Sequence, residues 1–224
     1  MASPARKPVV PDYTVKAGAH ERTVKAGTRQ RALIAALALF DAQGVEATTI
    51  EQVRDAAEVS IGSLYHHFGS REGLVTALYE DLLERYRIAL MAELSKHDTP
   101  RSFLDTFVKT HIAWSVRHPD AARFLAEHRY HRAVTMAEAK LQRGTAEFMR
   151  PLMLLFRPAV EAGILKPVAP DVLISLVVGP VQAWLRSHRA GKASLRPDLA
   201  AKQLADTIWD AIAVPTTARK TRKT

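Results

Sequence analysis

The chain of 224 residues contains no cysteine, which excludes disulfide bonds, thiolate metal ligands and a cysteine nucleophile. Long hydrophobic runs are also lacking: the most apolar stretches, residues 32–40 and 172–178, fall short of the roughly 20 residues that span a bilayer. The N-terminal residues lead into no apolar segment of the kind found in secretory signals. We therefore expect a cytoplasmic protein that has no membrane partner.

Alternating strand patterns of useful length are absent as well, whereas apolar residues recur at helical spacing along most of the chain. With 47% hydrophobic and 25% charged residues, the composition is that of a globular protein. The pattern predicts an all-α fold, in which Pro151 and Pro158 kink or divide one long helix. The expected helices cover residues 28–44, 49–57, 61–68, 71–95, 100–117 and 132–162, and others begin at Pro119, Pro170 and Pro197.

The net charge of +9 suggests a nucleic-acid partner, but it is unevenly distributed. Residues 1–28 hold five basic and two acidic residues and are predicted to form a flexible basic arm, and residues 215–224 form a basic tail. Residues 29–75 instead hold four basic and six acidic residues. The arm repeats the sequence TVKAG at residues 14–18 and 23–27. The repeat is either a chance duplication or part of a segment that touches phosphates or the minor groove.

The N-terminal third of the chain has the pattern of a helix-turn-helix. Thr48 or Thr49 caps the second of three short helices, and Thr48 with Glu51 has the spacing of a capping box. A turn at Glu58 then leads to Ser60, a favourable N-cap for the third helix. Three short helices with a short turn between the second and the third are the helix-turn-helix arrangement.

Within this pattern, VSIGSLYHHF over residues 59–68, followed by SREGL over residues 70–74, resembles the TetR family of bacterial repressors. Phe40 and Gly44 at the end of the first helix match the same family. The resemblance implies a transcriptional regulator, a repressor and not an enzyme, that uses no cofactor. It divides the chain into the arm (1–28), a three-helix DNA-binding domain (29–75), a larger helical ligand-binding and dimerisation domain (76–214) and the tail (215–224).

The resemblance also implies which residues contact DNA. The third helix enters the major groove, where serine hydroxyls donate or accept hydrogen bonds and Ile61 meets a thymine methyl group. Gly62 allows close approach of the backbone. The residues expected at base edges are Ser60, Ile61, Gly62, Ser63, Tyr65 and His66, and those expected at phosphates are Thr49, Tyr65, His67 and Arg71. The structural alternatives are that Thr49 and Ser60 act only as caps, Tyr65 only packs and the histidines only face solvent.

Two features depart from the family pattern. Glu58 occupies the turn position at which relatives usually carry glycine, and a positive φ is costly for glutamate. The third helix contains no lysine or arginine, although many relatives have a basic residue at the position of Ile61. With its net acidic charge, the DNA-binding segment is expected to bind non-specific DNA weakly unless the basic arm contributes.

The resemblance implies that the C-terminal helices form a homodimer, and their apolar pattern fits that role. The helix from residue 171 to 190 is apolar on two sides, so one side can serve its own domain and the other a partner. The alternative is that both C-terminal helices complete a monomeric core. The expected interface residues are Leu173, Leu176, Val177, Trp184, Leu204, Ile208 and Trp209. A dimer presents two recognition helices to a palindromic operator about 34–36 Å apart.

The resemblance also implies that a small-molecule effector binds between these two regions. Aromatic and methionine residues there are candidates for its pocket, although such residues also build cores. His111 and Trp114 are the expected polar contacts, and the expected effector is an apolar or aromatic molecule. The candidate pocket residues are Phe103, Phe107, His111, Trp114, Phe124, Phe148, Met149 and Met153.

Two other classes of function are alternatives to the transcriptional regulator. His128 and His131 beside Glu127 have the spacing of metal ligands in a helical enzyme, but a third ligand is lacking and neighbouring arginines indicate a solvated face. We therefore expect no metal. The other competitor is a protein that coats DNA without sequence preference through its basic tails, which predicts steep salt dependence. Activation in place of repression also remains open.

Overall fold

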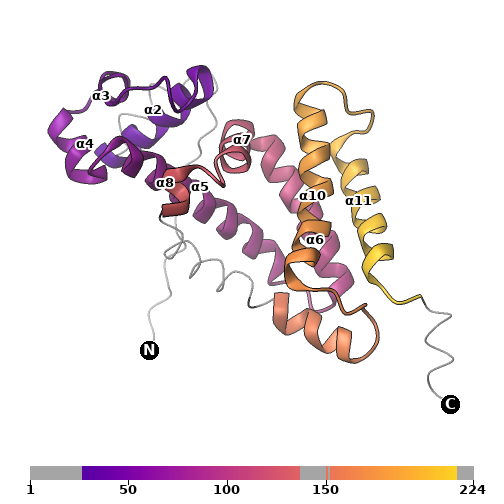
Figure 1. Ribbon diagram of the computed structural model, residues 1–224. Coiled ribbons are helices and arrows are strands. Elements are labelled where there is room, and N and C mark those ends of the chain that lie inside the picture. The colour runs from indigo at the N-terminus through magenta and orange to yellow at the C-terminus, as the bar shows by residue number, and fades with distance from the viewer. Residues whose placement is uncertain (1–26, 137–149, 151, 216–224) are drawn as a thin grey trace, which may run out of the picture. The chain divides into compact units, whose positions relative to one another are not determined.

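The computed structural model describes residues 27–136, 150 and 152–215, and the regular elements of that part are α-helices (Figure 1). An isolated antiparallel bridge joins Leu165 to Ala213 at the end of the last helix. The all-α prediction is confirmed. The helices are α2 (Thr28–Gln43), α3 (Ile50–Ala57), α4 (Ile61–Phe68), α5 (Arg71–Leu94), α6 (Pro100–Arg117), α7 (Pro119–Glu127), α8 (Arg132–Met136), residues 152–161, α10 (Pro170–Arg189) and α11 (Pro197–Ile212).

Local sequence signals set most of the helix ends. Proline lies in the first turn of α6, α7, α10 and α11, where its missing N–H is not needed and its fixed φ suits the helix. Gly44 ends α2 with a φ of 86°. Pro158 lies inside the helical residues 152–161, so the helix is not divided at this proline, and the alternative, a kink there, stays a prediction. Pro151 lies outside the described residues.

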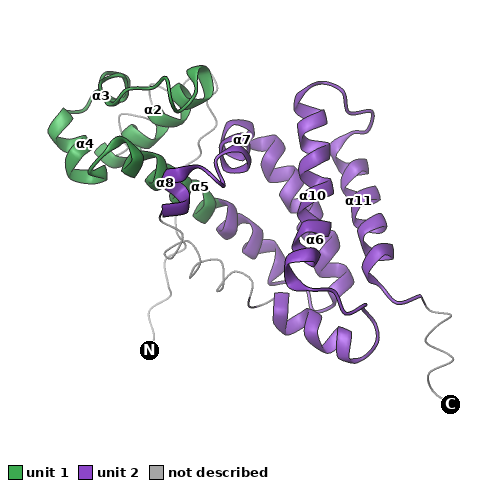
Figure 2. Cartoon of the chain, viewed as in Figure 1, with its two compact units in different colours: residues 1–85 green, residues 86–224 purple. Residues whose placement is uncertain are grey.

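The chain separates into two compact units, unit 1 at residues 1–85 and unit 2 at residues 86–224 (Figure 2). The boundary falls inside α5, and so does the boundary after residue 75 that the sequence suggested. Because α5 is continuous through both positions, the sequence carries no break that marks the division. Within the described residues, no helix combines the length and apolarity needed to cross a membrane.

In unit 1, α2, α3 and α4 pack against one another, and the N-terminal part of α5 completes the unit. The buried residues recur at helical spacing, as the sequence predicted, and include Leu33, Leu37, Val53, Leu64, Phe68, Leu74 and Leu78. Arg85 joins α5 to α2: it pairs with Asp81 at 2.7 Å and donates to the side-chain oxygen of Gln30 at 3.2 Å. These contacts hold the start of α2 against α5.

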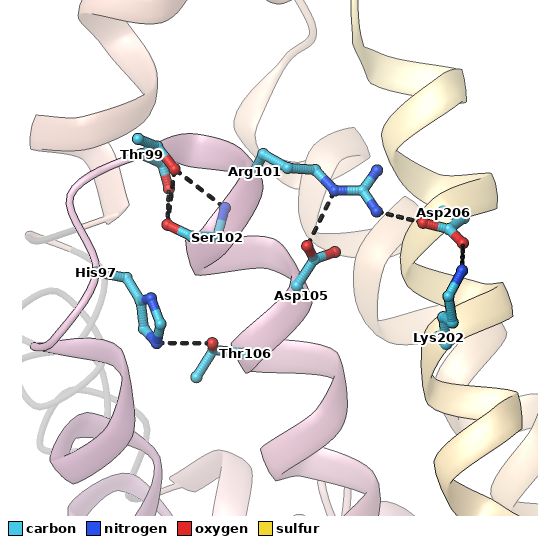
Figure 3. Close-up of polar contacts among 8 residues, drawn as sticks. All are labelled: His97, Thr99, Arg101, Ser102, Asp105, Thr106, Lys202 and Asp206. Carbon is cyan, nitrogen blue, oxygen red and sulfur yellow. Dashed lines mark hydrogen bonds and ion pairs between the residues drawn. The ribbon is translucent and has the colours of Figure 1, made fainter.

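In unit 2, α6 packs against α10 and α11 around an apolar core. Arg101 of α6 forms ion pairs with Asp105 and with Asp206 of α11 (Figure 3). Its guanidinium group also lies 5.5 Å from the ring centroid of Trp209. Lys202 and Arg101 hold the pKa of Asp206 below its usual range through hydrogen bonds to its carboxylate. The two helices are thus joined by polar contacts beside their apolar contact.

Candidate functional site

The start of α3 is fixed by a capping box made by Thr49 and Gln52. The Thr49 hydroxyl accepts from the Gln52 N–H at 3.2 Å, and the Gln52 side chain accepts from the Thr49 N–H at 2.8 Å. The expected capping box of Thr48 and Glu51 is therefore wrong by one residue. Thr48 is buried, and its hydroxyl donates to the carbonyl oxygen of Gly44 at 2.8 Å. Thr49 itself is exposed, as a phosphate contact requires.

The turn between α3 and α4 places Glu58 in the left-handed region, with φ 53° and ψ 50°. The N–H of Val59 donates to the Arg54 carbonyl oxygen at 3.2 Å, and that of Glu58 to the Asp55 carbonyl oxygen at 3.3 Å. This pair of bonds closes the helix in a Schellman motif. The positive φ considered from the sequence is therefore present, and a glutamate occupies a position that favours glycine.

Helix α4, which the sequence predicts to enter the major groove, is capped by Ser60, whose hydroxyl oxygen accepts from the Ser63 N–H at 3.1 Å. The Ser60 hydroxyl also donates to that of Ser63 at 3.0 Å, so each serine already has a partner within the helix. Leu64 and Phe68 are buried and anchor the inner side of α4. The local sequence thus fixes the start of the helix and its buried side together.

The outer side of α4 carries the residues expected at base edges. Ile61 is 36% exposed and Tyr65 is 51% exposed, and Gly62 and His66 are exposed beside them. A Cβ atom at Gly62 would meet nothing within 4 Å, so this part of the helix has open space in front of it. His67 is also exposed, and its ring lies 5.4 Å from that of His66. The structure therefore brings the predicted DNA-contacting side chains of α4 to one surface.

Arg71 makes intramolecular hydrogen bonds that the sequence did not predict. Its Nε donates to the carbonyl oxygen of Thr48 at 3.0 Å, and its Nη2 donates to that of Val45 and lies 3.3 Å from the Glu46 carboxylate. These bonds tie the start of α5 to the loop before α3. They explain a basic residue at this helix start without a phosphate contact, and a cation there otherwise opposes the helix dipole.

Gly73 explains how closely α4 and α5 are joined. A Cβ atom at this position would lie 1.9 Å from the carbonyl oxygen of Phe68, the last residue of α4. Ser70 caps α5 through a bond from the Gly73 N–H to its hydroxyl oxygen at 3.0 Å. The absence of a side chain at Gly73 therefore sets the distance between the two helices and fixes the angle at which α4 is held.

The expected pocket residues of unit 2 differ in where the structure places them. Phe103 and Phe124 are buried, Phe103 against Phe156 and Phe124 stacked on His128. Met153 is exposed, so packing does not direct it toward the core. The remaining residues are Phe107, His111 and Trp114, which α6 brings near one another, and Phe148 and Met149, which lie outside the described residues.

His111 is the centre of a buried polar network. Its Nδ1 shares a hydrogen bond with the Tyr86 hydroxyl of α5, and its Nε2 lies 3.1 Å from the side-chain nitrogen of Gln182 of α10. Burial lowers the pKa of His111 to about 4 and raises that of Tyr86, so both are neutral near pH 7. Sequence reasoning missed Tyr86 and Gln182, because only the packing of three helices brings them to His111.

The expected interface residues differ in exposure. Leu176 is 37% exposed, whereas Ile208 is 4% exposed and belongs to the core of unit 2. Placing Ile208 at the interface was therefore wrong, because its side of α11 faces inward. The others are partly buried and packed against that core: Leu173, Val177, Trp184, Leu204 and Trp209.

His128 and His131 lie at the end of α7 with their ring centroids 5.9 Å apart. Each contacts the backbone: His128 Nδ1 lies 3.1 Å from the Phe124 carbonyl oxygen, and His131 Nδ1 accepts from the Ala133 N–H at 3.2 Å. Among the residues that the structure describes, no group of three or more histidine, aspartate or glutamate side chains is placed to hold a metal ion. The two rings thus have local structural contacts.

Two family models match the chain. The model for bacterial regulatory proteins of the tetR family matches residues 32–78. The model for the Tetracyclin repressor-like C-terminal domain matches residues 79–214, more than half of the chain. The two matches adjoin and together include the helix-turn-helix of unit 1 and the core of unit 2.

Individual proteins are similar over nearly the same length. The HTH-type transcriptional repressor KstR2 of Rhodococcus jostii is 27% identical over 209 residues, 88% of this chain and 97% of that protein. The HTH-type transcriptional repressor NicS of Pseudomonas putida is 26% identical over 181 residues, 79% of this chain and 84% of that protein. The crystal structure of a TetR family transcription regulator from Marinobacter aquaeolei matches with a TM-score of 0.75 and 18% identity, covering 88% of this chain and 99% of that one. This structural likeness shows a shared fold.

Proposed function

Because the chain belongs to the TetR family of bacterial transcription regulators, we propose that it represses transcription as a homodimer on a palindromic operator and is released by a small molecule. It is a DNA-binding regulator and not an enzyme, since that is the function of the family. Repression is supported by relatives such as KstR2 and NicS, which are named repressors. A regulator of bacterial genes acts where the chromosome lies, in the cytoplasm.

The observation that carries the proposal is the exposed side of α4. Tyr65 and Ile61 are large side chains that stay exposed while Leu64 and Phe68 are buried on the opposite side. The exposed tyrosine has hydrogen-bonding and apolar groups for a DNA groove. We propose that Ile61, Gly62, Tyr65 and His66 meet base edges. Thr49 and His67 reach phosphates, and the Tyr65 hydroxyl can reach them as well. We propose that Ser60 and Ser63 also meet base edges. Their hydroxyl groups then give up the hydrogen bond between them and bond the DNA instead.

The net charge of the DNA-binding segment indicates that basic residues elsewhere in the chain also contact phosphates. The net charge of residues 29–75 is −2, from four basic and six acidic residues, so this segment alone gains little from the phosphate field. We propose that the basic residues of the arm add phosphate contacts in the complex. Residues 1–26 of the arm lie outside the described residues.

A homodimer is supported by an exposed apolar side of α10. Val172 is 46% exposed, Leu176 is 37% exposed, and Ala183 is exposed on the same side of the helix. No charged residue occurs between Asp171 and Arg186 in the sequence. Solvated helices usually carry charge on their exposed side, and an apolar surface rimmed by charge is typical of an interaction site. We propose that this side of α10, with the exposed Leu199 of α11, packs against the same surface of a second copy.

The direct test is binding of the full chain to the DNA upstream of its own gene and of neighbouring genes. The titration is made near physiological salt with excess competitor DNA. We expect saturable binding to one inverted repeat, and we expect Tyr65→Ala to weaken it about tenfold or more. Tyr130→Ala is the matched control, because Tyr130 is 82% exposed in unit 2 and should leave the affinity unchanged.

Gly62→Ala separates folding from DNA contact. Since a Cβ there meets nothing within 4 Å, the change should stabilise α4 by up to about 1 kcal/mol through helix propensity. It should nevertheless weaken operator binding if the backbone approaches the bases. Binding that competitor DNA abolishes, with a steep salt dependence and no effect of either α4 variant, would favour the rival protein that coats DNA without sequence preference.

A further inference from the structure

The described part of unit 2 leaves one buried polar atom of the His111 network without a partner. The side-chain oxygen of Gln182 is buried and makes no hydrogen bond within the described residues. Such an atom costs free energy unless a partner is supplied, and an unsatisfied group in a folded protein points to a water, a ligand or a functional role. The neighbouring atoms indicate which partner fits.

The hydrogen bonds in the network have a direction. If the Gln182 amide nitrogen donates to Nε2 of His111, the proton of the neutral imidazole lies on Nδ1 and is donated to the Tyr86 oxygen. The Gln182 oxygen then lacks a donor. Turning the amide over reverses each bond and leaves the Gln182 NH₂ group lacking an acceptor. A hydroxyl group satisfies both arrangements, because it donates and accepts, whereas a ketone or an ether oxygen satisfies only the second.

The surroundings of the network are aromatic and uncharged. The Tyr86 ring lies 5.1 Å from that of Trp114, and the Phe107 ring lies 5.9 Å from that of His111. Burial is the cause of the lowered pKa of His111 and of the raised pKa of Tyr86. An ion brought to this place would lose its hydration without gaining a counter-charge from these groups. An uncharged molecule with an apolar frame has no such cost.

We propose that Gln182, oriented by His111 and Tyr86, binds the hydroxyl group of an uncharged alcohol or phenol, and that this molecule is the effector. Phe107 and Trp114 contact its apolar frame. The site rests on the proposed function of unit 2 as the effector-binding part of the regulator. Tyr86 of α5, His111 of α6 and Gln182 of α10 together allow a bound molecule to bias the packing of three helices.

The test uses three matched probes and calorimetric titration of the full chain without DNA. β-Naphthol offers a hydroxyl group, β-naphthyl methyl ether offers only an acceptor, and naphthalene offers neither. We expect β-naphthol to bind about tenfold or more tightly than the other two, the ratio that corresponds to one additional buried hydrogen bond. Equal affinities, or no binding of β-naphthol, would overturn the proposal and indicate that water alone satisfies the Gln182 oxygen.

A pair of variants locates the effect. Gln182→Met keeps the length of the side chain without its amide and should remove the preference for β-naphthol. Gln203→Met is the matched control, because Gln203 is exposed on α11, and it should keep the preference. If Gln182→Met does not fold, as judged by circular dichroism, Tyr86→Phe takes its place and should reduce the same preference. A preference that persists in the folded Gln182 variant would assign the hydroxyl to another residue and refute the site.

Operator release is measured separately, so the two proposals can fail independently. If β-naphthol binds through Gln182 but leaves the operator complex intact at saturation, the hydroxyl site stands and the effector role fails. If the three probes bind alike while the chain still binds its operator, the regulator stands and the hydroxyl site fails.

Discussion

Replacing Glu58 by glycine should stabilise unit 1. Glu58 is exposed and has φ 53°, a conformation that costs a residue with a Cβ roughly 1–2 kcal/mol. Glycine removes that cost but loses about 0.4–1 kcal/mol through the greater freedom of the unfolded chain. The expected net gain is about 0.5–1 kcal/mol, or a rise in Tm of roughly 1–4 °C for a chain of this size. Thermal and urea unfolding followed by circular dichroism measure it.

Two controls separate backbone strain from the loss of the carboxylate. Glu58→Ala removes the same charge but keeps the Cβ, so we expect no comparable gain. Glu51→Gly makes the same substitution at an exposed position in the first turn of α3, where the backbone is helical, and should lower stability by up to about 1 kcal/mol. If Glu58→Gly lowers Tm as Glu51→Gly does, the strain at the turn is refuted. If Glu58→Ala gains as much as Glu58→Gly, the charge and not φ is the cause.

Three further predictions concern other parts of the structure. Gly73→Ala should lower the free energy of unfolding in urea by about 2–3 kcal/mol, because its Cβ would lie 1.9 Å from the Phe68 carbonyl oxygen; an unchanged midpoint would contradict this close approach. His111 has a pKa lowered to about 4, against about 6.5 when unfolded, so the stability present above pH 6.5 is lost as the pH falls toward 4. Urea unfolding should show that the free energy of unfolding falls by about 2 kcal/mol between pH 6.5 and 5, and His111→Gln should remove this fall. Equal slopes of the free energy of unfolding against pH in the two proteins would refute the prediction. Leu176→Arg should produce monomers in analytical ultracentrifugation, whereas an intact dimer would exclude this side of α10 from the interface.

The exposed side of α4, which we propose contacts DNA, was largely predictable from sequence because its signals are local. Ser60 caps α4, and Leu64 and Phe68 recur at helical spacing and become buried, which exposes Tyr65 on the other side. The choice between adjacent threonines as the cap of α3 was not predictable in this way. Thr49 takes that position because Thr48 is buried and its hydroxyl donates to the Gly44 carbonyl oxygen.

Contacts between positions that are distant in sequence were not predicted. The sequence did not reveal that Arg71 bonds carbonyl oxygens 23 and 26 residues earlier in the chain, and its phosphate contact stays a prediction. The apolar residues of α11 do not reveal by themselves which of them its own domain covers, and Ile208 lies in the core of unit 2. No sequence pattern marked Gln182 as a polar contact of the pocket, since its partner His111 lies 71 residues away.

By itself, the sequence determined the all-helical fold, the family and the prolines and serines at which the helices begin, because these depend on residues within a few positions of each other. Tertiary structure alone decided which apolar sides face inward, where Arg71 finds its acceptors and that Tyr86, His111 and Gln182 meet. The physical reason is that burial and hydrogen bonding between helices depend on groups far apart along the chain. The local periodicity of apolar residues does not show which of these groups come into contact.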